Sequence, residues 1–301
     1  MENVINIIYL PDITPLPTPI RSGDRSMKEG EFEISTKVDG EKVVYRRRST
    51  LEERTLIYDS GRCVGCLLCE IPCPVDAIDM GATGSVARGL VEAPKLVVDM
   101  ELCTFCGICS ETCPFNSYEF YIDGKPIRGA EDYLTYERSF EMDASEVRLK
   151  GRELERMLEE RAGTCPRGAL VAGKGSLEFL ERECIYCQGC VGEDHGLDIK
   201  VKRAIEGAIT VDNERCQGCG ACRDICPTKA PSYPRPGVGE SVEKTVIDER
   251  ICNYCGACEK VCPVDAIKVT RNRINYRKGR EAPWTAMWVE AFEKLKTESE
   301  V

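Results

Sequence analysis

Cysteine is the residue type whose number and spacing most clearly imply chemistry in this sequence. The chain has 301 residues, of which 20 are cysteines. Four segments share the spacing C-x2-C-x2-C-x3-C-P, and they begin at Cys63, Cys103, Cys216 and Cys252. Three thiolates in one such run can wrap one corner of an inorganic cube, whereas zinc usually takes its ligands from two separated C-x2-C pairs. The continuous runs therefore predict 4Fe–4S cubes rather than zinc.

The segments around each motif indicate the elements that must position these thiolates. A short β-rich run ending in aspartate precedes each motif: LIYD, LVVD, ITVD and TVID. The same four residues, VDAI, follow Cys-Pro at 75–78 and again at 264–267. The predicted unit is a strand, a ligand loop, a short helix, a Cys-Pro turn and a second strand. Glycine in the loop would let backbone N–H groups point at the sulfurs, and the glycines expected to do so are Gly65, Gly107, Gly218 and Gly256.

The motif resembles the signature of bacterial-type ferredoxins, in which the fourth cysteine binds the other cube of a pair. With adjacent motifs paired, the resemblance implies two modules with two cubes each. In the first module, the ligand sets are Cys63, Cys66, Cys69 with Cys113, and Cys103, Cys106, Cys109 with Cys73. In the last module, they are Cys216, Cys219, Cys222 with Cys262, and Cys252, Cys255, Cys258 with Cys226.

The remaining four cysteines lie between these modules in an unusual order. Cys165-Pro166 stands alone, and the trio Cys184, Cys187 and Cys190 follows 19 residues later. Aligned with full motifs, the segment lacks one cube, whose ligand positions are occupied by Glu155, Leu158, Arg161 and Asp194. We interpret it as a degenerate module that keeps one cube, bound by the trio and Cys165. Five cubes then use all 20 cysteines.

Asp194 and the following His195 stand where the lost fourth cysteine and its proline would be. An aspartate can bind iron, but its position points to the missing cube, so we expect solvent exposure or hydrogen bonding for both residues. His195 is the only histidine. A chain with one histidine has little capacity for conventional catalytic triads or multi-histidine metal sites.

Composition limits the compartment and the partners. The start of the chain lacks the features of a signal peptide, and no apolar run approaches 18 residues. We therefore expect a cytoplasmic protein with no membrane span, in which disulfides are disfavoured because thiols are kept reduced. The net charge of −10 argues against a nucleic-acid partner. The one dense basic run, Tyr45–Ser49, is expected to be a solvated strand end or a partner-facing patch.

The predicted fold class is α+β, with three fused bacterial-type ferredoxin modules, of which the middle one is degenerate. The predicted divisions are an arm and hairpin at 1–52, modules at 53–130, 131–205 and 206–272, and a helical tail at 273–301. Alternation around Asp39-Gly40 predicts a β-hairpin over 31–48. Residues 145–163 have helical spacing and would fill the space of the lost cube.

Both ends of the chain carry apolar segments outside the cysteine motifs. Residues 1–20 contain four prolines and are expected to form a disordered tail or an arm lying on a neighbour. A helix over 283–296 would align five apolar residues on one face, which either packs on the chain's own modules or docks on a partner. These residues are Trp284, Trp288, Ala291, Phe292 and Leu295.

With these residues in hand, the chain resembles the archaeal polyferredoxins, and more narrowly the polyferredoxin subunit of formylmethanofuran dehydrogenase. The narrower cue is the long insertion between the first two motifs, which includes ARGLVEAPK, and the later YIDGKPIR. The resemblance implies a non-catalytic electron-transfer subunit in methanogenesis. Its partners would be soluble ferredoxin or heterodisulfide reductase, and a molybdenum or tungsten subunit like formate dehydrogenase.

Two other functions remain open at this point. The chain could serve a hydrogenase, carbon monoxide dehydrogenase or another reductase, or it could be a free-standing electron carrier. The apolar segments at both ends favour a subunit of a complex. A catalytic role is disfavoured, since no flavin or dinucleotide fingerprint is visible and every cysteine is assigned to a cube.

Overall fold

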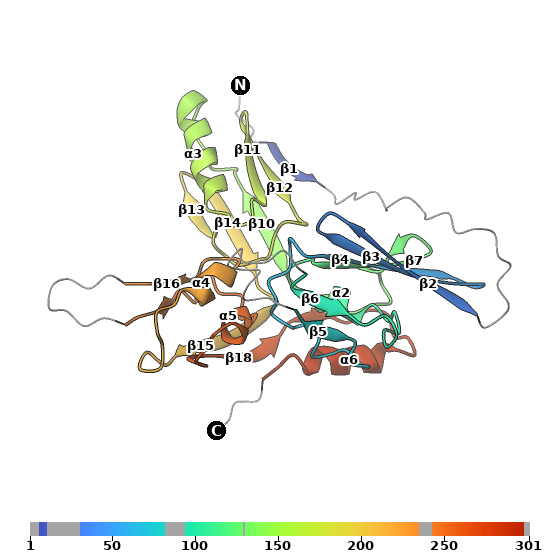
Figure 1. Cartoon of the computed structure of the whole chain (residues 1–301). Coiled ribbons are helices and arrows are strands. Elements are labelled where there is room, and N and C mark those ends of the chain that lie inside the picture. The colour runs from blue at the N-terminus through green and yellow to red at the C-terminus, as the bar shows by residue number, and fades with distance from the viewer. Residues whose placement is uncertain (1–5, 11–30, 82–93, 129, 235–242, 298–301) are drawn as a thin grey trace. The chain divides into compact units, whose positions relative to one another are not determined.

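The computed structural model describes residues 6–10, 31–81, 94–128, 130–234 and 243–297 (Figure 1). The chain divides into two compact units. The first unit comprises residues 13–136 and 277–295, and the second comprises residues 1–12, 137–276 and 296–301. Most of the insertion named above, residues 82–93, lies outside the described ranges, as do residues 1–5 and 11–20 of the predicted arm.

An antiparallel five-stranded sheet forms the frame of the first unit, in the order β2-β3-β4-β7-β8. Its strands are β2 (Phe32–Asp39), β3 (Lys42–Ser49), β4 (Glu53–Asp59), β7 (Tyr118–Ile122) and β8 (Lys125–Pro126). The predicted hairpin is present, with Asp39 opposite Lys42 across a turn in which Gly40 has a φ of 59°. A smaller pair, β5 (Ile78–Met80) and β6 (Leu96–Val98), and helix α2 (Ile108–Glu111) complete the cysteine-bearing part.

The C-terminal helix α6 (Thr285–Glu293) packs within the first unit. Trp288 and Phe292 are almost fully buried and make edge-on contacts with the rings of Tyr133 and Tyr136, respectively. Trp284 is 40% exposed, stacks on Tyr133 and donates its indole N–H to the carbonyl of Asp132. Of the two alternatives predicted for this helix, the structure shows packing on residues of the same chain.

The last predicted module lies in the second unit and repeats the strand pattern of the first. A long outer pair, β15 (Ile205–Val211) with β18 (Ile267–Ile274), corresponds to β4 with β7. A short inner pair, β16 (Pro231–Ser232) with β17 (Val246–Ile247), corresponds to β5 with β6. Helices α4 (Ala221–Ile225) and α5 (Ala257–Lys260) contain the third cysteines of the two motifs, Cys222 and Cys258. The short helix is thus present within three of the four full motifs, while the first motif has turns instead.

The middle segment has the same two pairs with additions. Its outer pair is β10 (Ser139–Asp143) with β14 (Leu197–Lys202), and β13 (Gly192–Asp194) extends it. Its inner pair is the hairpin β11 (Leu170–Gly173) with β12 (Ser176–Leu180). Helix α3 (Gly151–Gly163) stands where a first cysteine loop would be.

Two expectations for this region change in detail. The helix begins at Gly151 rather than Ser145, because residues 143–147 form turns: the Asp143 carboxylate accepts the Ser145 N–H, and the Ala144 carbonyl accepts the Val147 N–H. The described part of the arm, β1 (Asn6–Leu10), adds in parallel to the edge of β12. This part of the arm therefore lies on a strand of its own chain.

Candidate iron–sulfur centres

All five cysteine loops, including the one in the middle segment, share one backbone conformation. The second and fourth residues after the first cysteine have a positive φ, between 49° and 86°. At the second position these residues are Gly65, Phe105, Tyr186, Gly218 and Tyr254, and at the fourth they are Leu67, Gly107, Gln188, Gly220 and Gly256. All four predicted glycines have this conformation, but half of the ten positions hold another residue type. Such strain in non-glycine residues is typical of functional sites.

This conformation aims backbone N–H groups at the first sulfur of each loop. The amides of Gly65, Tyr186, Gly218 and Tyr254 donate to the Sγ atoms of the cysteines two residues before them, at 3.3–3.4 Å. An amide that donates to sulfur stabilises the thiolate form and tunes an iron–sulfur group bound there. The middle loop does this in the same way as the loops of the full motifs.

The aspartates that precede the motifs start these loops. The carboxylates of Asp59, Asp99, Asp212 and Asp248 accept backbone N–H groups two or three residues later, at 2.8–3.2 Å. Three of these residues also accept the N–H of the first cysteine with their carbonyl oxygen, namely Asp59, Asp99 and Asp212. The side chains form the turns that asparagine and aspartate favour, so the acidic residue before each motif has a structural role.

The Cys-Pro turns also repeat five times. The third residue after each of these cysteines has a φ between 48° and 66°, and these residues are Asp76, Asn116, Gly168, Lys229 and Asp265. The amide of the next residue donates to the cysteine Sγ in four of the turns, at 3.2–3.3 Å, from Ala77, Ser117, Ala169 and Ala266. Cys165, the isolated cysteine, therefore has the same local geometry as the fourth cysteine of a full motif.

In the first unit, the structure brings together cysteines from different motifs. Burial raises the pKa of Cys69 well above its ordinary value, and the nearby thiols of Cys113 and Cys63 raise it further. Burial likewise raises the pKa of Cys109, with further contributions from Cys106, Cys103 and Cys73. One apolar cavity is lined by five cysteines: Cys69, Cys73, Cys103, Cys106 and Cys109. The fourth cysteine of each motif thus lies with the trio of the other motif.

The last two motifs show one half of this exchange, because Cys226 lies with the trio of the other motif. A cavity in the second unit is lined by four cysteines, Cys226, Cys252, Cys255 and Cys258, together with apolar side chains. Burial raises the pKa of Cys255 to about 12, and the thiols of Cys226 and Cys252 add to this shift. The other trio also gathers, because Cys219 and Cys216 contribute to the raised pKa of Cys222, whose first cause is burial.

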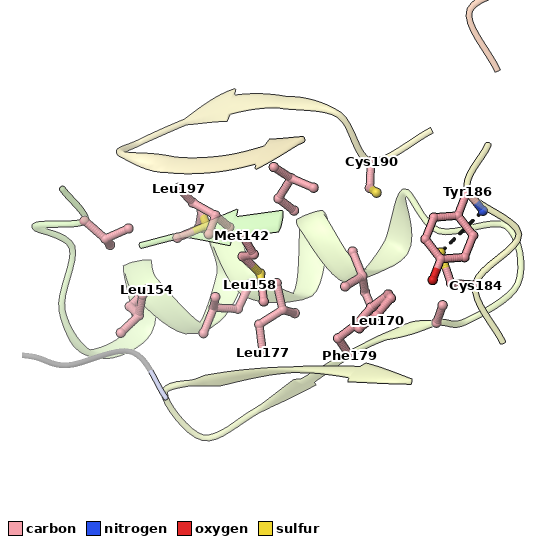
Figure 2. Close-up of a cluster of buried hydrophobic side chains, with 14 residues drawn as sticks. Met142, Leu154, Leu158, Leu170, Leu177, Phe179, Cys184, Tyr186, Cys190 and Leu197 are labelled. Carbon is pink, nitrogen blue, oxygen red and sulfur yellow. Dashed lines mark hydrogen bonds between the residues drawn. The ribbon is translucent and has the colours of Figure 1, made fainter. Parts of the chain in front are cut away.

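In the middle segment, Cys165 lies with the distant trio. The pKa values of Cys184 and Cys190 are raised to about 12, mainly by burial and in part by the Cys165 thiol. Cys165 also raises the pKa of Cys187, again after burial as the main cause. Figure 2 shows Cys184 and Cys190 at one end of the apolar core of this segment, with the Tyr186 amide directed at the Cys184 sulfur.

That core includes side chains of α3, the helix that carries three of the aligned positions of the predicted lost ligands. Leu158, on α3, has no exposed surface and belongs to a buried cluster with Leu154 of the same helix. Figure 2 shows these leucines facing Leu177 and Phe179 of the β11–β12 hairpin. Phe179 in turn stacks on Phe140 with ring centroids 4.0 Å apart. Apolar side chains thus pack around one of these positions, Leu158, and their replacement of a lost cube stays a prediction.

Two other positions of the missing cube also converge. Arg161, at a lost ligand position, lies 3.9 Å from the carboxylate of Asp194, at the lost fourth position, and donates to the carbonyl of Cys190. The Asp194 carboxylate also lies 3.6 Å from Nε2 of His195, whose side chain is 61% exposed. Asp194 and His195 therefore have the exposed, polar contacts that we expected.

Three arginines cover the loops in a way that the sequence analysis missed. The guanidinium groups of Arg47, Arg138 and Arg203 lie 5.4, 4.4 and 5.7 Å from the ring centroids of Phe105, Tyr186 and Tyr254, respectively. Each aromatic ring stands at the strained second position of a loop, where the other two loops have glycine. An aromatic residue at that position was the available signal. Within the basic run, Arg47 packs on a loop and donates to the Thr104 carbonyl, while Arg48 is exposed.

The donor sets fit 4Fe–4S cubes. All 20 cysteines lie in the described ranges and are present as thiols. Within those ranges, no three histidine, cysteine, aspartate or glutamate side chains close around a single metal ion. A cube instead needs thiolates spread over its corners, amides directed at sulfur and an apolar pocket. Thiols of both full modules line such pockets, and each of the five loops supplies the amides.

Comparisons with known proteins agree with this fit. The family of 4Fe-4S dicluster domains matches residues 47–117 and 215–266. The polyferredoxin protein FwdF of Methanocaldococcus jannaschii is 51% identical over 96 residues, which are 32% of this chain and 27% of that protein. The match thus spans about a quarter of the curated relative. These findings confirm the predicted 4Fe–4S domains and the resemblance to a polyferredoxin.

A solved structure extends the resemblance to most of the chain. A chain in the formate dehydrogenase–heterodisulfide reductase–formylmethanofuran dehydrogenase complex from Methanospirillum hungatei matches with a TM-score of 0.73 and 27% identity. The match covers 89% of this chain and 92% of that chain. Within the part of the chain that the structure describes, no helix combines the length and apolar character needed to cross a bilayer.

Proposed function

We propose that this chain is an electron-transfer subunit that relays electrons through five 4Fe–4S cubes, held by the five ligand sets predicted from the spacing. The observation that carries this proposal is the crossed gathering of the thiols: Cys165 lies with Cys184, Cys187 and Cys190, as Cys73, Cys113 and Cys226 lie with the trios of their partner motifs. We further propose that the middle segment is a degenerate ferredoxin module.

The residues of the chain would hold and tune the cubes. A bound 4Fe–4S cube exchanges one electron, at a potential set by hydrogen bonds to sulfur, burial and nearby charge. The thiols of the trio in the middle loop are buried, which excludes water. The amides of Tyr186 and Ala169 donate to the first and the fourth sulfur of that set. This rigid frame would limit rearrangement when an electron arrives.

The proposed path runs between soluble ferredoxin, or a partner of the heterodisulfide reductase type, and the molybdenum or tungsten subunit of a formylmethanofuran dehydrogenase complex. Support comes from the solved complex, because the match with this chain covers 92% of the corresponding chain there. The match includes most of this chain, which favours a subunit of a complex over a free-standing carrier.

Anaerobic purification of the native protein would test this proposal. We expect the chain to co-elute with a molybdenum- or tungsten-containing subunit, and addition of formylmethanofuran to bleach the visible absorption of its cubes. Elution of the chain alone, with no bleaching by formylmethanofuran, would contradict the proposed complex.

A further inference from the structure

Two cysteine loops of the second unit are in direct contact. The side-chain amide Nδ2 of Asn253 donates to the carbonyl oxygen of Ile185 at 2.7 Å. Both residues are more than nine-tenths buried. Ile185 directly follows Cys184, and Asn253 directly follows Cys252, so the loops 184–190 and 252–258 meet at equivalent positions.

One arginine binds the loop 252–258 beside this contact, from the connection between the middle and the last predicted modules. Arg203 lies between β14, which ends at Lys202, and β15, which begins at Ile205. Its Nη1 donates to the carbonyl oxygens of Cys252, at 2.6 Å, and Glu249, at 3.0 Å. Because both acceptors are neutral carbonyls, these bonds hold the guanidinium in place without neutralising its charge.

The connection itself is fixed to both modules. On one side, the Gln188 side chain, in the middle loop, donates to the carbonyl of Val201 at 2.9 Å. On the other side, the amide of Asn275 donates to the carbonyl of Ala204 at 2.7 Å, and its side chain to that of Arg203 at 3.4 Å. Arg203 is therefore positioned by contacts with both modules.

The contacts of Arg203 adjoin both ligand sets. Its acceptor Cys252 belongs to one set, and the next residue, Asn253, contacts Ile185 beside Cys184 of the other set. Arg138 offers a comparison within the same unit, because its guanidinium lies 4.4 Å from the ring centroid of Tyr186 in the middle loop. Arg203 thus binds beside the contact between the two loops, and Arg138 stacks on the middle loop.

We propose that the loops 184–190 and 252–258 form an electron-transfer junction, and that Arg203 is the shared cation that sets the potentials of the two cubes on either side. This inference rests on the proposed function, because it requires cubes in both ligand sets. One electron leaves one cube, which is oxidised by one equivalent, and reduces the other. No bond breaks and no proton moves.

A shared cation would have a specific electrostatic effect at such a junction. Each cube becomes more negative on reduction, so an electron on one disfavours reduction of the other by Coulomb repulsion. A cation held beside the contact between the two loops favours the reduced form of both cubes and opposes this repulsion. Arg203 is thus a positioning residue for charge, and Asn253 holds the two loops at contact distance.

Redox titration of the full chain, followed by electron paramagnetic resonance, would test the proposal. In Arg203→Gln, we expect two of the five cubes to become harder to reduce, with about a tenfold higher ratio of oxidised to reduced form at a given potential, which is 59 mV for a one-electron couple. Arg203→Lys keeps the charge and should restore most of the shift. The matched control Arg138→Gln should shift one cube.

The second arm of the test removes the middle cube. In the Cys165→Ala chain, we expect Arg203→Gln to shift only the cube of the Cys252 set. If Arg203→Gln keeps its full iron content but shifts one cube or none, or if Arg203→Lys shifts the cubes as strongly as Arg203→Gln, the junction proposal is wrong. A wild-type chain that binds no iron would instead refute the proposed function.

Discussion

Cys165→Ala perturbs the one ligand that spacing alone does not connect to its trio. The Cys165 thiol contributes to the raised pKa values of Cys184, Cys187 and Cys190, whose main cause is burial. Its Sγ accepts the amide of Ala169 at 3.2 Å, as the fourth cysteines of three full motifs do. The substitution therefore removes one corner of the proposed middle cube and leaves the other four ligand sets unchanged.

The magnitude follows from the ligand count. One cube in five holds one fifth of the iron, so the content should fall from about twenty to about sixteen iron atoms per chain. Cys165 packs against the apolar core of the middle segment only as a partly buried residue, whereas the core itself contains fully buried side chains such as Leu158 and Leu177. We therefore expect the variant to remain folded, with its circular dichroism close to that of the wild type.

Asp194→Ala is the matched control in the same segment. Asp194 is the alternative ligand that follows the trio in the alignment, and its side chain is 41% exposed and pairs with Arg161. An exposed pair contributes about 0–1 kcal/mol, so the variant should keep about twenty iron atoms per chain. The reasoning is refuted if Cys165→Ala retains all its iron, or if Asp194→Ala loses about four atoms.

Three further predictions concern packing and exposure. Leu158→Ala should lower the free energy of unfolding of the second unit by about 2–5 kcal/mol, because the side chain is fully buried. The control Arg156→Ala, on the exposed side of α3, should change this free energy by less than about 0.5 kcal/mol. Denaturant titration measures both. Trp288→Ala should cost the first unit about 3–5 kcal/mol, and an unchanged midpoint would show that α6 does not pack there. Cys219 is the one exposed cysteine, so brief exposure to oxygen should destroy the cube of its set first. The loss of each cube is measured by its electron paramagnetic resonance signal, and earlier loss of the buried middle cube would contradict this prediction.

The sequence predicted the ligand loops well because their geometry is local. C-x2-C-x2-C spacing, glycine at Gly107 or Gly256 and the aspartate before each motif act within a few residues of one another. The β2–β3 hairpin around Gly40 and the packing stripe of α6 were also readable, since turn residues and helical periodicity are local signals. The pairing of Cys165 with a distant trio followed from comparing repeats.

The contacts between separate segments could not be read in this way. Nothing near Arg203 or Arg47 in the sequence indicates that their guanidinium groups cover aromatic rings 51 to 58 residues away. The contact between Asn253 and Ile185 spans 68 residues and depends on how the two loops are oriented. The late start of α3 depends on turns that compete with the helix. Such features are fixed by tertiary packing rather than by local propensity.

Iron and acid-labile sulfide in the anaerobically purified full chain test the central claim most directly. Because 20 cysteines are assigned to five cubes, the account predicts about twenty iron atoms and about twenty sulfides per chain. A chain with about sixteen or about twenty-four of each, or a colourless chain whose cysteines form disulfides, would contradict it.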